Sequence, residues 1–352
     1  LLPRCKTARE AVALLGKIIE TQGAGEGFGV GFADDKEVWY LETGTGHQWM
    51  AQRTPAEVYF ASGNQGRLRF FDPKDDTMMG SPTLISFAEE HGFYDPKSGK
   101  FDFAAAYTRN DDRDRIYNDP RVWVMQKILN PSLEQKVADG RNFDVYLKPE
   151  QPVTLQNLKD IMRNHFEGYA HDPYSFGLNG SEPWRPISVF RTYEAHILQV
   201  RPWMPREIGD VIYVAFGMAC LSCFMPFYQG LDQVPAAFGE GTDHADDKSI
   251  YWKFRKLQTL AMTDFPTLAP IVQKKFAEHE ATMSEKQSAM EKEYTSLYAT
   301  DKQAAHDLLQ KFNLEVFGET EEVIDGLMNE LFTVLTTKIE KENFFANKKM
   351  KD

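Results

Sequence analysis

Hydrophobic residues alternate with small or polar ones through residues 27–69, and this period of two is typical of β-strands. The pattern predicts an antiparallel meander of strands near residues 28–32, 38–41, 47–52 and 58–62. Clusters of Gly and Asp separate the runs, as tight turns require. The last run leads into Gly63-Asn64-Gln65-Gly66, so a polar amide flanked by glycines ends the predicted meander.

Asn64 has two interpretations. An asparagine after a strand can direct its side-chain N–H at an oxyanion, and flanking glycines let a substrate backbone approach closely. Asn and Gly are also among the commonest residues of plain turns. The local sequence alone favours the plain turn.

A second β-rich block spans residues 184–228. Here we expect two short strands, one around Ile187 and one around Ile197, and a third at residues 211–216. Apolar residues three and four positions apart predict helices before, between and after the two blocks, namely at 7–21, after Pro82, from Asp119-Pro120, at 153–165, at 251–262, within 268–317 and at 319–343. We therefore expect an α+β fold, with a domain of residues 1–248 and a helical C-terminal region of residues 249–352 packed on it.

Composition narrows the class of protein. The 352 residues are 42% hydrophobic and 13% aromatic, which is typical of a globular chain with a substantial core. A net charge of −12 disfavours a general nucleic-acid binder, although a local basic patch is compatible with it. No purely apolar run is long enough to span a membrane.

Cysteine usage bears on the compartment. Three cysteines, Cys5, Cys220 and Cys223, are too few for a disulfide framework and indicate a reducing, cytoplasmic compartment. The sequence starts without Met, so we expect a fragment or processed product, and an upstream signal peptide would not be visible.

Three clusters allow a chemical interpretation beside a structural one. His165, His171 and Asp172 suggest a metal, but their spacing fits no common ligand motif, so we predict no metal site. Cys220 and Cys223 have CxxC spacing in an apolar segment, where we expect small buried residues. The guanidinium groups of Arg185, Arg191 and Arg201 suit carboxylate recognition, although each one alone is more typical of a surface or inter-strand charge.

Several stretches in order carry a family resemblance: EVWYLETGTGHQWMAQRTP, SGNQGRLR, YTRNDDRDRIYNDPRVW, RPISVFRTYEAHILQVRP and MPFYQG. Together they resemble the cysteine dipeptidases of lactic acid bacteria, which are N-terminal-nucleophile (Ntn) hydrolases. Secernins are relatives of this family, and penicillin V acylase and bile salt hydrolase are more distant ones. The resemblance implies a four-layer αββα sandwich of two antiparallel sheets, here incomplete at its N-terminus and followed by a helical extension.

The resemblance also implies a mechanism. In the family, an N-terminal cysteine attacks the amide carbonyl and its own α-amino group serves as the base. That nucleophile and the Arg and Asp after it would precede Leu1, and the three cysteines of this sequence do not match it.

Some site residues can be carried over. Asn64 matches the family's oxyanion-stabilising asparagine, which reverses the preference for a plain turn. Arg185 is the better match to the distal active-site arginine, with Arg191 a close competitor. Gln65 and Arg191 are candidates for substrate binding.

The resulting hypothesis is a dipeptidase that hydrolyses dipeptides by cysteine acyl transfer and is inactive without its nucleophile. We expect no cofactor, small dipeptides as the partners, no nucleic acid or membrane, and a homo-oligomer as one option. An N-acyl amide hydrolase of the acylase type and a non-catalytic, secernin-like interaction protein are the alternatives.

Overall fold

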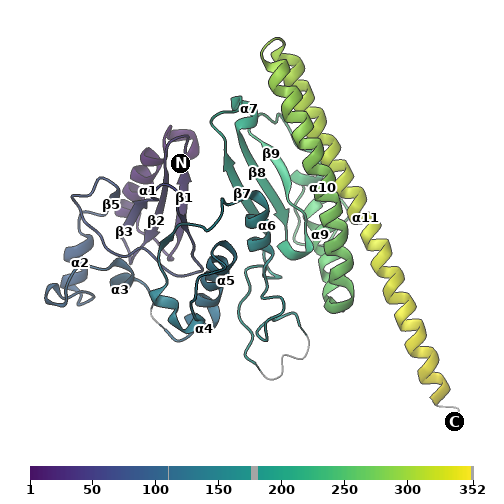
Figure 1. Ribbon diagram of the computed structural model, residues 1–352, viewed down its shortest axis with the longest axis horizontal. Coiled ribbons are helices and arrows are strands. Elements are labelled where there is room, and N and C mark those ends of the chain that lie inside the picture. The colour runs from purple at the N-terminus through teal and green to yellow at the C-terminus, as the bar shows by residue number, and fades with distance from the viewer. Residues whose placement is uncertain (110, 176–180, 350–352) are drawn as a thin grey trace. The chain divides into compact units, whose positions relative to one another are not determined.

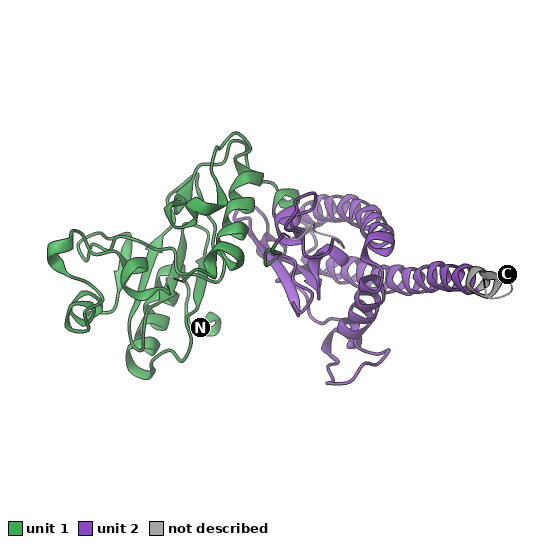
Figure 2. Cartoon of the chain, turned by 90° about the horizontal axis from the view of Figure 1, so that it is seen from below, with its two compact units in different colours: residues 1–157, 182–185 green, residues 158–181, 186–352 purple. Residues whose placement is uncertain are grey.

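The computed structural model describes residues 1–109, 111–175 and 181–349, with side chains up to residue 343. These residues form two compact units, shown in different colours in Figure 2. Unit 1 consists of Leu1–Asn157 with Glu182–Arg185, and unit 2 of Leu158–Ser181 with Pro186–Asp352. The α+β class with antiparallel sheets is confirmed in both units.

A four-stranded antiparallel sheet forms the centre of unit 1 (Figure 1). Its order is β1-β2-β3-β5, with β1 at Gly29–Ala33, β2 at Val38–Thr43, β3 at Trp49–Arg53 and β5 at Met78–Gly80. The first three strands confirm the predicted meander. A strand also forms within the fourth predicted run, but it does not pair with the third strand. β4 (Tyr59–Phe60) pairs instead with β6 (Tyr146–Leu147) in a separate two-stranded sheet. Pro55 has no N–H for a ladder and Glu57 has a φ of +61°, so the chain leaves the first sheet there.

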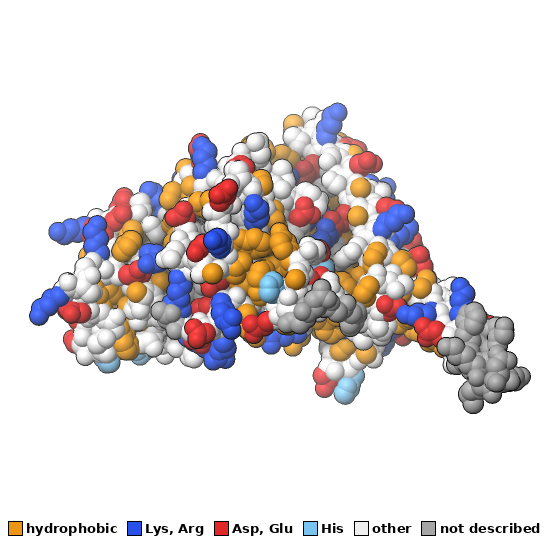
Figure 3. All heavy atoms as spheres, turned by 60° about the horizontal axis from the view of Figure 1, so that its bottom comes forward, with side chains coloured by type: hydrophobic (Ala, Val, Ile, Leu, Met, Phe, Trp, Pro, Cys, Tyr) orange, Lys and Arg blue, Asp and Glu red, His pale blue; other side chains and the backbone are white. Residues whose placement is uncertain are grey.

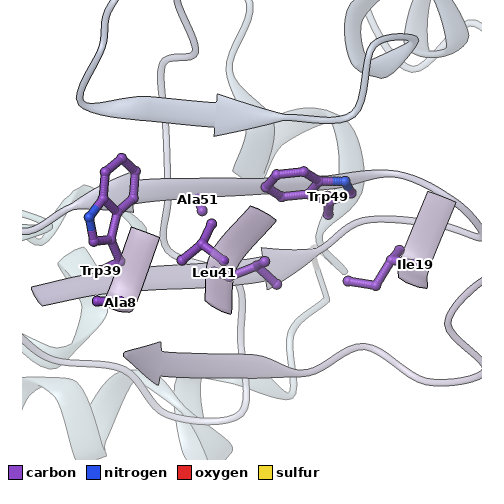
Figure 4. Packing of buried hydrophobic residues seen from close by; sticks show 7 residues of the cluster. Ala8, Ile19, Trp39, Leu41, Trp49 and Ala51 are labelled. Atoms are coloured by element: carbon purple, nitrogen blue, oxygen red, sulfur yellow. The ribbon is translucent and has the colours of Figure 1, made fainter. Parts of the chain in front are cut away.

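Helix α1 (Ala8–Gln22) covers one face of this sheet. It begins as predicted at Thr7, whose hydroxyl oxygen accepts the Glu10 N–H at 3.1 Å. The side chains packed between helix and strands, most of them labelled in Figure 4, are Ala8, Val12, Ile19, Trp39, Leu41, Trp49 and Ala51. Gly16 is required here because a Cβ would lie 2.1 Å from the Trp49 ring.

The opposite face of the sheet is covered by the segment that follows it. Met50 packs there against Leu68, Leu84 and Phe103. The helices of this part of unit 1 are α2 (Leu84–Glu90), α3 (Phe103–Tyr107), α4 (Asp114–Tyr117) and α5 (Asp119–Leu129). The helices predicted after Pro82 and from Asp119 are therefore confirmed.

A three-stranded antiparallel sheet forms the centre of unit 2, in the order β7 (Glu194–Val200), β8 (Asp210–Phe216), β9 (Met225–Tyr228). The strand expected around Ile187 was wrong, and β9 is the third strand instead. The backbone at that position makes local turn bonds, with the Val189 N–H donating to the Ile187 carbonyl at 3.0 Å. The helices are α6 (Leu155–Arg163, which starts in unit 1), α7 (Arg206–Gly209), α8 (Ala236–Gly239), α9 (Ile250–Met262), α10 (Phe265–Tyr298) and α11 (Lys302–Lys349).

The two long helices α10 and α11 run side by side in Figure 1. The chain turns between them after Tyr298, whereas the sequence placed a break near residue 318. Helix α11 continues through that region because Phe317 and Thr320 are fully buried in its packed face. Side-chain bonds from Gln287 to the Tyr213 and Tyr228 hydroxyls, at 3.0 and 2.7 Å, attach α10 to the sheet. The C-terminal helices thus pack with the second sheet in unit 2, and the division at residue 248 stays a prediction.

Figure 3 shows acidic and basic side chains interspersed over the face that it presents. Among the helices in the described parts of the chain, none combines the length and the apolar character that crossing a bilayer demands.

His306 on α11 lies between two carboxylates of unit 2. Its ring nitrogens lie 3.2 Å from Glu207 and 2.9 Å from Asp232, and these bonds raise the His306 pKa above its usual value of 6.5. The stabilisation of the folded chain by protonated His306 is therefore complete below the unfolded-state pKa of this histidine. It is lost as the pH rises through the raised folded-state pKa. We expect His306→Asn to lower the thermal midpoint of the chain at about pH 5 and to have little effect at about pH 8. Thermal unfolding across this range tests it, with His244→Asn, at a side chain 91% exposed, as the control; equal effects of His306→Asn at both ends would contradict it.

Candidate functional site

The turn that carries Asn64 is closed by its own residues. The Ser62 hydroxyl lies 3.1 Å from the Gly63 carbonyl and donates to the Gln65 carbonyl at 3.0 Å. The Asn64 side chain is exposed, and within the described parts of the chain it makes no hydrogen bond. The turn therefore presents an amide whose two N–H donors are available to a ligand.

Asn118, between α4 and α5, fixes the backbone of this turn. Its Oδ1 accepts the Asn64 N–H at 2.9 Å, and its Nδ2 lies 3.4 Å from the Asn64 carbonyl oxygen. Asn118 is itself buried and oriented by Asp114, which accepts from its Nδ2 at 2.5 Å. The exposed amide of Asn64 thus projects from a backbone that a buried side chain holds on both sides of the residue.

Glu42 on β2 fixes the other end of the turn. Its carboxylate accepts the backbone N–H of Arg67 at 2.8 and 2.9 Å and that of Leu68 at 3.0 Å. Glu42 is 2% exposed, and burial raises its pKa to about 7 despite these bonds and the neighbouring Arg67 charge. A buried carboxyl therefore ties the turn to the central sheet.

The two glycines beside Asn64 and Gln65 have a different role from the one predicted. A Cβ on Gly66 would lie 2.1 Å from the Thr108 methyl group, and one on Gly63 would lie 3.0 Å from the Asn118 Oδ1. Their missing side chains make room for residues of the protein itself. On the side where a Cβ would lie, these glycines therefore leave no room for a substrate backbone.

Arg185 lies in unit 1, close to the residues that hold Asn64. Its N–H donates to the Ile116 carbonyl at 2.9 Å, and its guanidinium lies over the Tyr117 ring, 4.5 Å from the centroid. Arg121 donates to the same Asn118 Oδ1 that binds Asn64, at 2.5 Å. Burial and then the Arg185 charge lower the Arg121 pKa to about 10. Two guanidinium groups therefore lie near one another beside the Asn64 turn.

The remaining predicted site residues have other surroundings. Gln65 donates from Nε2 to the Asp119 carboxylate at 3.2 Å, and its Oε1 is buried without a hydrogen-bond partner among the described residues. Arg191 is exposed and belongs to unit 2. Arg201 forms a two-pronged ion pair with Glu291 at 2.9 and 2.8 Å, so it has a structural role.

The histidine and cysteine clusters take structural arrangements. His165 is buried, with Nδ1 2.9 Å from the Asp172 carboxylate, and the described residues hold no cluster suited to a metal ion. All three cysteines are free, and Cys220 and Cys223 are buried as predicted. Burial raises the pKa of Cys220 to about 12 and that of Cys223 further, so both are neutral thiols near pH 7.

Sequence reasoning missed Glu42, Asn118 and Arg121. The signal for Glu42 was a carboxylate directly after the apolar run Val38–Leu41, because a charge that is buried there requires partners. Asn118 and Arg121 belong to the quoted stretch YTRNDDRDRIYNDPRVW, but nothing in their spacing links them to Asn64, 54 positions away from Asn118 in sequence.

The raised pKa of Glu42 gives a prediction for stability. Because the folded-state pKa is about 7 against an ordinary 4.5, the folded chain holds this proton more tightly and loses stability as the pH rises through that window. The rise corresponds to a loss on the order of 3 kcal/mol for the Glu42 contribution. Urea unfolding at several pH values should show this loss in the native chain and not in Glu42→Gln. A wild-type stability that rises relative to Glu42→Gln across the window would contradict it.

The sequence profile of peptidase family C69 matches residues 1–278. A probable dipeptidase of Salmonella dublin is 54% identical over 232 residues, which cover 66% of this chain and 53% of the relative. A dipeptidase of Bifidobacterium longum is 32% identical over 78% of this chain and 54% of the relative. Dipeptidase A of Lactobacillus helveticus is 25% identical over 96% of this chain and 71% of the relative.

The chain spans about half the length of the first two of these relatives. The family match covers all of unit 1, including the turn at Asn64 and the segment at Arg185, and it extends into helix α10 of unit 2. The chain therefore belongs to peptidase family C69.

Proposed function

We propose that this chain is part of a dipeptidase that hydrolyses the amide bond of dipeptides by cysteine acyl transfer. The observation that carries the proposal is the exposed amide of Asn64, which has no side-chain partner among the described residues and stands on a turn fixed from both sides. The dipeptidase names of the relatives support the substrate class.

Asn64 has the properties of an oxyanion donor. When a thiolate attacks the scissile carbonyl carbon, the carbonyl oxygen becomes an oxyanion and gains hydrogen-bond strength. A donor stabilises this state best when it does not have to reorganise. The bonds from Asn118 and Glu42 fix the backbone on which Asn64 stands, so little motion is needed. The tetrahedral intermediate then expels the amine and leaves a thioester, which water hydrolyses.

We assign the attacking sulfur to a residue other than the cysteines of this sequence. Cys220 and Cys223 are buried, with raised pKa values that keep them protonated. Cys5 precedes helix α1, which packs on the sheet face opposite Met50 and Leu68, away from the Asn64 turn. The nucleophile is thus proposed to lie on polypeptide outside this sequence.

The four-layer αββα sandwich remains part of the proposal. It is supported by the architecture of the two units, because each contains an antiparallel sheet with helices packed on it. An experimental structure of the product of the complete reading frame tests it directly. Sheets that do not face one another would contradict the Ntn fold.

The function itself is tested by hydrolysis of a dipeptide panel. We expect activity in the product of the complete reading frame and none in the 352-residue chain alone. Competing substrates, a dipeptide and an N-acyl amino acid, separate the dipeptidase from an acylase. Hydrolysis by the short chain would contradict the placement of the nucleophile, and preference for the N-acyl compound would contradict the substrate class.

Asn64→Ala in the complete protein removes the proposed donor. We expect kcat to fall by about 10²–10³, as for other single oxyanion donors, with a smaller change in KM. Asn329→Ala, at an exposed position on α11, is the matched control and should leave kcat unchanged. Steady-state kinetics measure both, and equal kcat values for Asn64→Ala and the control would refute the role.

Arg185 and Arg191 compete for contact with the substrate. We assign this contact to Arg185, because it lies beside Tyr117 and Arg121 near the Asn64 turn. Arg185→Ala should lower kcat/KM by at least ~10-fold, while Arg191→Ala should change it by less than about 3-fold. The reverse order of effects would transfer the assignment to Arg191.

A further inference from the structure

Next to the Asn64 turn, unit 1 contains a cavity of about 200 Å³ that the proposed function does not yet use. It is more than ten times the ~10–15 Å³ that one buried water needs, so it has room for a small amino-acid residue. Gln65 and Gly66 form part of its wall, so the cavity adjoins the turn that carries Asn64. The charged residues in its lining are Arg67, Arg69, Arg109, Asp114 and Arg141.

The charge of this lining is opposite to that of the chain. Four arginines face one aspartate here, whereas the whole chain has a net charge of −12. A basic cavity in an acidic chain concentrates anions locally.

The ion pairs around the cavity do not neutralise it fully. Arg69 is paired with Asp102 at 2.6 Å and Arg109 with Asp111, whereas Arg141 is only loosely paired with Asp114 at 3.5 Å. The side chains of Arg69 and Arg141 are both 40% exposed, so their remaining N–H donors can reach a ligand.

Arg67 adds a buried charge behind the wall. It is 4% exposed, and its Nη2 donates to the carbonyls of Phe143 and Asp144 at 3.1 and 2.7 Å. Its Nε is buried without a hydrogen-bond partner among the residues that the structure describes. The guanidinium keeps its positive charge, and the neighbouring carboxyl groups of Glu42, Asp119 and Asp144 offset part of it.

We propose that this cavity binds the free C-terminal carboxylate of the substrate, with Arg141 and Arg69 as its donors. The inference rests on the proposed function, because it assigns the cavity to the same substrate. A dipeptide has its carboxylate one residue beyond the scissile carbonyl, and the wall of the cavity includes Gln65 and Gly66 of the turn that carries Asn64. Such a subsite selects dipeptides, because a longer peptide has an amide in place of the carboxylate at that point.

Calorimetric titration of the 352-residue chain at low salt tests the inference without any need for hydrolysis. The probes are L-alanyl-L-alanine and its C-terminal amide, L-alanyl-L-alaninamide. We expect the dipeptide to bind at least ~10-fold more tightly than the amide, because the amide lacks the charge that an arginine fork recognises. Equal binding of the two probes, or no binding of the dipeptide, would overturn the inference.

Variants place the effect in the cavity. Arg141→Gln should weaken dipeptide binding at least ~10-fold, and Arg141→Lys should restore part of it. Arg53→Gln is a matched control, because Arg53 is 41% exposed and pairs with Glu37 at 3.7 Å, much as Arg141 pairs with Asp114. Thermal unfolding confirms that each variant is folded. Equal losses in Arg141→Gln and Arg53→Gln would show a general charge effect and reject the subsite.

Hydrolysis by the complete protein separates this inference from the proposed function. Selective binding of the dipeptide without any hydrolysis by the complete protein would support the subsite and reject the dipeptidase. Equal hydrolysis of the dipeptide and its amide would support the hydrolase and overturn the subsite.

Discussion

The arrangement around Asn64 depends on one buried carboxyl. The side chain of Glu42 lies on the face of the central sheet opposite α1. Its carboxylate accepts hydrogen bonds from the backbone N–H groups of two successive residues, Arg67 and Leu68. Arg67 and Leu68 are both buried, so their backbone N–H groups need an acceptor within the protein. The Glu42 carboxylate thus accepts the hydrogen bonds that the carbonyl groups of a neighbouring strand would otherwise accept. The chain can therefore leave the sheet after β3, form β4 elsewhere, and return to the same sheet as a fixed turn.

Asn118 connects this turn to the arginines. Its Oδ1 accepts from both the Asn64 backbone and Arg121, and its Nδ2 donates to Asp114. A charged donor and a charged acceptor on the same amide polarise it, which strengthens its bond to the Asn64 N–H. Arg185 lies near Arg121 and contributes to lowering its pKa, so the two cations repel one another. An anionic ligand beside them would relieve that repulsion.

Much of the fold could be predicted from the sequence, and the errors have a physical origin. Strands β1, β2, β3 and β8 and helix α1 have strong periodicity, and each was placed within a few residues. The fourth strand was predicted at the right residues but with the wrong partner, because an apolar pair such as Tyr59 and Phe60 indicates a strand without specifying its partner. The final helix was predicted to begin at residue 319, whereas α11 runs without a break from Lys302 and buries Phe317 in its packed face. Local pattern determines the type of an element better than its partner or its end.

For the candidate site, the sequence supplied Asn64 and Arg185, and the structure supplied what surrounds them. Glu42, Asn118 and the basic cavity depend on contacts between residues far apart in the chain, so no spacing rule identifies them. The role of the glycines could not be predicted from the sequence either. A glycine between polar residues is compatible with ligand approach or with close internal packing, and only the position of Thr108 decides between them. Internal packing fills that space, so the parts of this turn that are open to a ligand are the exposed Asn64 amide and the arginine-lined cavity.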